Sequence, residues 1–78
     1  MNNITTPGVT EHTENYKGFI ISWQEPPMMG GIWTANVATS SPHLLSLMRR
    51  NGAEVVQARA RDEMIAKAKQ YIDRLLAQ

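Results

Sequence analysis

The sequence predicts an α+β domain, and three patterns within its 78 residues support that prediction. Two segments, 16–24 and 32–40, alternate apolar and polar residues with the two-residue period of a β-strand. The segment 61–78 repeats its apolar residues with the period of an amphipathic helix. Together with a short helix and a short strand between them, these segments predict a three-stranded, mainly antiparallel sheet in the order β-β-α-β-α. The long C-terminal helix is expected to pack on one face of that sheet.

The C-terminal helix is the element on which the rest of the chain is expected to pack. We place its first residue near Asp62, because Arg61 would otherwise lie inside the apolar arc. At about 100° per residue, the apolar side chains fall within one arc of about 140°. These side chains are Met64, Ile65, Ala68, Tyr71, Ile72, Leu75 and Leu76.

The first two strands offer this helix a surface of matching length. One face of the pair holds Phe19, Ile21, Trp23, Trp33, Ala35 and Val37. At about 3.3 Å per residue the strands extend about 25–30 Å, close to the helix length of about 25 Å. We therefore expect the helix to bury this face.

A short helix is predicted over residues 42–50, with recognisable signals at both ends. Ser41 followed by Pro42 is typical of an N-cap and a first helical residue. Asn51-Gly52 supplies a left-handed stop after it. Residues 53–58 then form the third strand, whose direction stays open because a helical connection permits parallel or antiparallel pairing.

The connector between the first two strands contains two adjacent methionines, Met28 and Met29, between Pro26-Pro27 and Gly30-Gly31. The prolines end the strand by removing backbone donors, and the glycines permit a reversal. We consider two roles for the methionines. They either cover the open end of the core or form an adaptable contact surface for a protein partner.

Residues 16–78 are expected to form a single domain, preceded by a disordered leader over residues 1–15. The leader is rich in Thr and Asn and shows no periodicity; a partner-binding tail is the alternative. The chain contains no cysteine, so no disulfide can stabilise so small a core. Self-association would bury additional surface, and we include it among the expected partners.

Charge and hydropathy argue against several classes of partner. The formal net charge is +1, and the balance of +3 over residues 49–78 is mild, well short of a nucleic-acid footprint. No apolar run reaches the length of a membrane span, and no signal-peptide pattern is visible. We therefore expect a cytoplasmic protein without a membrane partner.

Groups that could perform catalysis or hold a metal are scarce. His12 lies in the expected leader and His43 on the polar side of the short helix, and neither has a second ligand at suitable spacing. Gly30-Gly31 joins two strands and opens no helix, so it is not a phosphate loop. The sequence predicts no enzymatic activity, no cofactor and no metal.

Four arginines offer a second type of candidate site. Arg49 and Arg50 end the short helix, while Arg59 and Arg61 precede the long one. If these helix ends share one edge of the fold, the guanidinium groups form a patch for phosphate or carboxylate. Otherwise each arginine is simply exposed to solvent or interacts with the end of its own helix. The predicted partner-binding residues are therefore Met28, Met29, Arg49, Arg50, Arg59 and Arg61, with weak RNA or DNA binding as the alternative function.

Three segments resemble the β-β-β-α unit of HicB-type bacterial antitoxin domains: Tyr16-Lys17-Gly18-Phe19, residues 31–37 and residues 62–68. The resemblance implies a small protein-binding module. The chain departs from that family where the helix 42–50 replaces a Pro-Asp-Leu-Pro-Gly-like segment, and no separate DNA-binding segment follows in this sequence. The double-stranded-RNA-binding fold shares the strand and helix order, but its N-terminal helix and lysine cluster have no counterpart. We therefore expect a non-enzymatic interaction domain and transfer no functional residue from either family.

Overall fold

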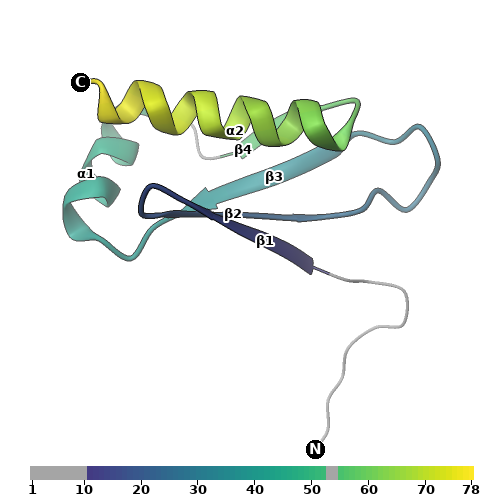
Figure 1. Ribbon diagram of the computed structural model, residues 1–78, viewed down its shortest axis with the longest axis horizontal. Coiled ribbons are helices and arrows are strands. Elements are labelled where there is room, and N and C mark those ends of the chain that lie inside the picture. Colours follow the sequence, from purple (N-terminus) through teal and green to yellow (C-terminus); the bar gives the residue numbers. More distant parts are fainter. Residues whose placement is uncertain (1–10, 53–54) are drawn as a thin grey trace, which may run out of the picture.

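The computed structural model describes residues 11–52 and 55–78, which form one antiparallel sheet and two helices. The elements in chain order are β1 (Glu11–Tyr16), β2 (Phe19–Gln24), β3 (Trp33–Ala38), α1 (Pro42–Asn51), β4 (Val55–Ala58) and α2 (Arg61–Leu76). In Figure 1, α2 runs along one face of the sheet and α1 lies at one end of it. The predicted α+β class and the long C-terminal helix are confirmed.

The sheet contains four strands, so the prediction of three is wrong. The segment 16–24 is not one strand: Lys17 and Gly18 form a two-residue turn between β1 and β2, with φ of 50° and 89°. Positive φ at both turn residues is the type I′ geometry that matches the twist of a hairpin. The leader prediction is also wrong for residues 11–15, which belong to β1, while the rest of the predicted leader lies outside the described residues.

The strand order is β1-β2-β3-β4, and every neighbouring pair is antiparallel. The connection through α1 therefore returns the chain antiparallel to β3, which answers the question that the sequence left open. Ala35 lies opposite Trp23 on one side and Val56 on the other, so the same sheet face continues across three strands.

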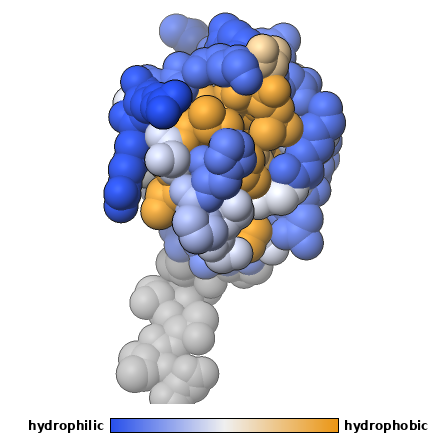
Figure 2. Space-filling view, turned by 90° about the vertical axis from the view of Figure 1, so that its left-hand side faces the viewer, coloured by the Kyte–Doolittle hydropathy of each residue, from blue (hydrophilic) through white to orange (hydrophobic). Residues whose placement is uncertain are grey.

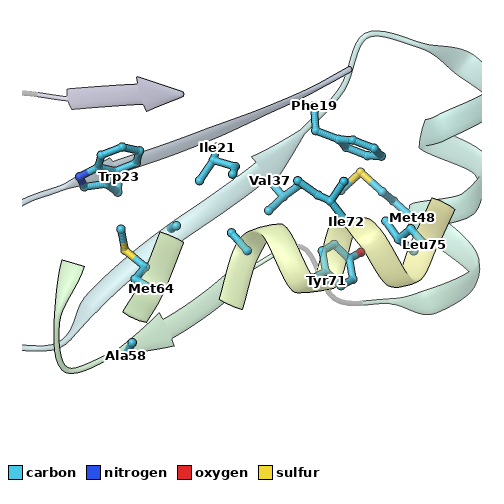
Figure 3. Packing of buried hydrophobic residues seen from close by; sticks show 12 residues of the cluster. Phe19, Ile21, Trp23, Val37, Met48, Ala58, Met64, Tyr71, Ile72 and Leu75 are labelled. Carbon is cyan, nitrogen blue, oxygen red and sulfur yellow. The ribbon is translucent and has the colours of Figure 1, made fainter. Parts of the chain in front are cut away.

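The hydrophobic core lies between this face and α2 (Figure 3). Its buried residues are Phe19, Ile21, Trp23, Ala35, Val37, Met48, Ala58, Met64, Ala68, Tyr71, Ile72 and Leu75. Thus α2 buries the predicted face, although Trp33 is only half-buried and Leu76 is exposed. The packing follows from the two periodicities, because each element turns one apolar surface toward the other.

Both ends of α1 follow the predicted signals. The Leu44 backbone N–H donates to Ser41 Oγ over 3.4 Å, and Pro42 occupies the first helical turn. Gly52 adopts φ of 78°, and its N–H donates to the Met48 carbonyl oxygen over 2.9 Å. Within the described ranges, neither α1 nor α2 has the length and apolar character needed to cross a bilayer.

Candidate protein-binding surface

The predicted partner-binding residues lie at two opposite ends of the molecule. Arg59 and Arg61 lie where α2 begins, and Arg49 and Arg50 end α1, which lies where α2 finishes (Figure 1). The sixteen residues of α2 separate these ends by about 24 Å. The four arginines therefore do not form the single patch that a shared edge would have allowed.

Two side-chain hydrogen bonds fix α1 at the C-terminal end of α2. Gln78 Nε2 donates to Asn51 Oδ1 over 2.9 Å, and Asn51 Nδ2 donates to Gln78 Oε1 over 3.3 Å. Asn51 Nδ2 also donates to the Leu47 carbonyl oxygen over 2.8 Å. This reciprocal pair holds Arg49 and Arg50 far from the β2–β3 loop.

Met28 and Met29 lie at the tip of the β2–β3 loop and do not cover the core. Met28 is 74% exposed and Met29 is 102% exposed. The Gly31 N–H donates to the Met28 carbonyl oxygen over 3.0 Å, and Gly30 adopts φ of 81°, as in a type II turn. The turn therefore holds the two methionine side chains out in solvent.

Ile32 extends the apolar surface of the loop to the start of β3. It is 51% exposed, although it directly precedes the strand. We call Pro26, Pro27, Met28, Met29 and Ile32 the loop surface. The partner-binding residues predicted from the sequence include the methionines but not Ile32. The alternation of the strand places Ile32 on the sheet face away from α2.

Two open hollows flank Ile32, and their charges differ. The first, of about 380 Å³, is lined by the carboxylates of Glu11 and Glu25 and by no Lys or Arg. The second, of about 300 Å³, is lined by Arg59 and Lys67 as well as by Glu63. The loop surface is therefore an apolar ridge with an acidic hollow on one side and a mixed-charge hollow on the other.

A second apolar surface lies at the α1 end of the molecule. Figure 2 views this end and shows apolar side chains gathered among polar ones. Leu45 and Leu76 are the exposed large hydrophobic residues of the two helices, and a hollow of about 390 Å³ is lined by Leu45, Met48, Arg49 and Gly52. Both leucines are much less exposed than the methionines of the loop surface.

The sheet face opposite α2 is polar and almost uncharged. Its residues are Glu11, Thr13, Asn15, Ile20, Ser22, Gln24, Thr34, Asn36, Ala38, Val55 and Gln57. It holds no Lys, Arg or aromatic residue in the described strands, and these are the groups that bind phosphates and stack on bases. This face therefore lacks the chemistry of a nucleic-acid platform.

Charged groups join the β1–β2 hairpin to α2. Lys17 Nζ lies 2.8 Å from Asp73 Oδ1, and the Tyr16 hydroxyl donates to the same carboxylate over 3.0 Å. We call Tyr16, Lys17 and Asp73 the hairpin clasp. The hydrogen bond from Lys17 lowers the pKa of Asp73, and the same bond raises the pKa of Lys17. The clasp is a structural feature, because all three side chains are used in contacts with one another.

The two histidines do not meet in the structure. His12 lies in β1 and stacks on Trp23 with ring centroids 5.8 Å apart, whereas His43 is exposed on α1. In the part of the chain that the structure describes, no three His, Cys, Asp or Glu side chains gather as metal ligands would.

Comparison with family models, curated proteins and solved structures found no match for this chain.

Proposed function

We propose that this chain is a non-enzymatic protein-binding module that recognises its partner through the loop surface. The observation that supports this most is the complete exposure of Met29 at the tip of a turn. Apolar side chains gathered at a surface favour association, because contact with a partner removes them from water. Methionine suits such a contact, since its unbranched thioether chain adapts to an irregular partner.

The loop surface and the acidic hollow beside it suggest the chemistry of the partner. Burial of a methionine side chain contributes about 1.5–3 kcal/mol, so Met28 and Met29 together are the main source of affinity. Glu11 and Glu25 favour a positive charge next to the apolar contact. We therefore propose that the partner presents an apolar segment flanked by Lys or Arg.

The other expectations from the sequence add no residue to this surface. Nucleic-acid binding relied on four arginines that lie at two ends of α2. The resemblance to HicB-type antitoxin domains agrees with a protein partner, but it transfers no residue role to the loop. The proposal therefore depends on the exposure and charge of the loop alone.

A displayed library of random peptides tests the proposal. Peptides selected on the wild-type chain should combine apolar residues with Lys or Arg. The double variant Met28→Ser/Met29→Ser should bind them at least about tenfold more weakly, since each 1.4 kcal/mol is a factor of about ten. Ile20→Thr is the matched control, because Ile20 is an exposed apolar residue beside the β1–β2 turn, at the other end of β2 from the loop.

Thermal unfolding of all three proteins should give similar midpoints, because none of the substituted side chains is buried. If no peptide is enriched on the wild-type chain, or if selected peptides bind the double variant equally well, the loop surface is not the binding site. Equal losses in the double variant and in Ile20→Thr would also reject it.

A further inference from the structure

The four-stranded sheet has two edges, and they differ in how well they are protected. At the β4 edge, Lys67 Nζ donates to the Gln57 carbonyl oxygen over 3.0 Å. A lysine placed on an edge strand is a common barrier to pairing with another chain. Strand β4 is also short, with four residues, whereas β1 has six and contains no Pro, Gly or Lys. Helix α2 packs on β4 and β3, and among residues 11–52 and 55–78 no element lies along the outer edge of β1.

The register shows which backbone groups β1 offers at that edge. In a two-residue hairpin the residues that flank the turn, here Tyr16 and Phe19, face each other in a hydrogen-bonded pair. Because hydrogen-bonded and non-bonded pairs alternate along an antiparallel ladder, the N–H and C=O of Glu11, Thr13 and Asn15 point outward. The same alternation across the sheet turns the Gln57 carbonyl outward, which agrees with its bond to Lys67.

We propose that β1 pairs antiparallel with β1 of a second copy of this chain, centred on Thr13. In this register Thr13 lies opposite Thr13, and His12 of each copy lies opposite Glu14 of the other. Opposite threonines favour antiparallel pairing, and a ring N–H of His12 can donate a hydrogen bond to the Glu14 carboxylate. The interface is isologous, so both copies contribute the same contacts and the pairing closes as a dimer.

Neighbouring registers are less favourable for a physical reason. If the pairing shifted by one residue, side chains on the sheet face that packs on α2 would lie opposite side chains on the other sheet face. A shift by two residues would put Glu14 opposite Glu14, where like charges are destabilising, or His12 opposite His12, where the contact between His12 and Glu14 is lost. The sequence of β1 therefore specifies one register.

The two groups that form the proposed pairs are held in place and remain accessible. Glu14 Oε2 lies 2.6 Å from Lys69 Nζ on α2, and the Glu14 side chain is 37% exposed. His12 is exposed and stacks on Trp23. In the dimer, each Glu14 therefore lies between Lys69 of its own copy and His12 of the other. The result is one continuous eight-stranded sheet with both α2 helices on the same face.

The interface between the two β1 strands buries mainly polar groups, so the dimer is expected to be weak. Stable interfaces bury more than about 1,000 Å², and pairing of two six-residue strands is smaller than this. The expected behaviour is a monomer–dimer equilibrium that shifts toward dimer as concentration rises.

Disulfide trapping tests the register directly, because the chain contains no cysteine of its own. The proposed pairing brings the two Thr13 Cα atoms about 5.5 Å apart, within the range that a disulfide spans. The two Asn15 Cα atoms are displaced by four residues, which is about 13 Å. Under a mild oxidant Thr13→Cys should form a covalent dimer at least about tenfold faster than Asn15→Cys, a matched control on the same face of the same strand.

Sedimentation velocity over a concentration series supplies the second readout. The wild-type chain should sediment faster as concentration rises, whereas Thr13→Pro should remain a monomer with a similar unfolding midpoint. Proline removes an outward N–H and leaves the β1–β2 ladder intact. A wild-type chain that stays monomeric up to its solubility limit overturns the proposal, and so do equal trapping rates for the two cysteine variants.

Discussion

At the scale of single residues, Asp73 is the group that attaches the hairpin to α2. It accepts hydrogen bonds from Tyr16 and Lys17, and its pKa is lowered from the ordinary value of 3.8, chiefly by the bond from Lys17. The clasp therefore stabilises the fold above pH 3.8 and loses this contribution as the pH falls through the lowered pKa. The pKa of Lys17 is raised above 10.5, so its contribution is lost only as the pH rises beyond that value.

Asp73→Asn is expected to lower the unfolding midpoint at neutral pH, because the charge of the clasp is removed. The difference from wild type should shrink below pH 3.8, where the wild-type carboxyl becomes protonated too. Thermal unfolding followed by circular dichroism from pH 2.5 to 8 (about 0.05 M salt, where surface charges are only partly screened) measures this. Glu25→Gln is the control, since Glu25 has no ion pair among the described residues. A difference that stays constant across the whole range would contradict the role of Asp73.

At the scale of elements, α1 is stabilised by its caps as well as by its packing. Met48 is its single fully buried residue in the described structure, and Leu44 and Leu47 are partly buried against the core. Ser41 accepts the Leu44 N–H, and its own N–H donates to Thr39 Oγ1 over 3.2 Å. Thr39 in turn donates to the Gly18 carbonyl oxygen over 3.0 Å, which connects the start of α1 to the β1–β2 turn.

Ser41→Ala is expected to reduce the free energy of unfolding by about 1 kcal/mol, the usual value of an N-cap. Urea titration followed by tryptophan fluorescence measures the change. Ser46→Ala is the matched control, because Ser46 is exposed in the middle of α1 and alanine favours a helix. If both substitutions have the same effect, the cap does not stabilise α1.

The elements that the sequence predicted well are those with a local or periodic signal. The alternation through Ile21 and Trp23 predicted β2, and Ser41 with Gly52 predicted the limits of α1. Strand β1 was missed because it is an edge strand with polar residues on both faces, so it shows no hydrophobic alternation. Gly18 was the available signal, since a glycine that interrupts a strand pattern often marks a turn.

At the scale of the whole molecule, the positions of the arginines depended on information that no local pattern contains. The sequence placed Arg50 and Arg59 at helix ends, but only the antiparallel return of β4 beside β3 decides where those ends lie. That return starts α2 at the loop end and finishes it beside α1 (Figure 1). The exposure of Met29 was equally undetermined, because the loop conformation decides whether a side chain turns toward the core.

The whole fold is expected to depend on the contact between α2 and the sheet. Helix α2 provides Met64, Tyr71, Ile72 and Leu75 to the core, together with the small Ala68. At about 1.5–3 kcal/mol for each large side chain, the four contribute about 6–12 kcal/mol. This is comparable to the entire net stability of a domain, which is about 5–15 kcal/mol. Removal of the helix also exposes the apolar face of β2 and β3.

A chain truncated after Arg61 should therefore show no cooperative unfolding, and its tryptophan emission should be red-shifted and readily quenched by acrylamide, because Trp23 loses its cover. A chain that lacks only Ala77 and Gln78 is the control. It loses the hydrogen bonds between Asn51 and Gln78 but keeps every buried residue of α2, so it should still unfold sharply. Differential scanning calorimetry and fluorescence quenching measure both chains. A sharp transition with shielded indoles in the longer truncation would show that the sheet folds without α2, and the packing between them would then not be what stabilises this domain.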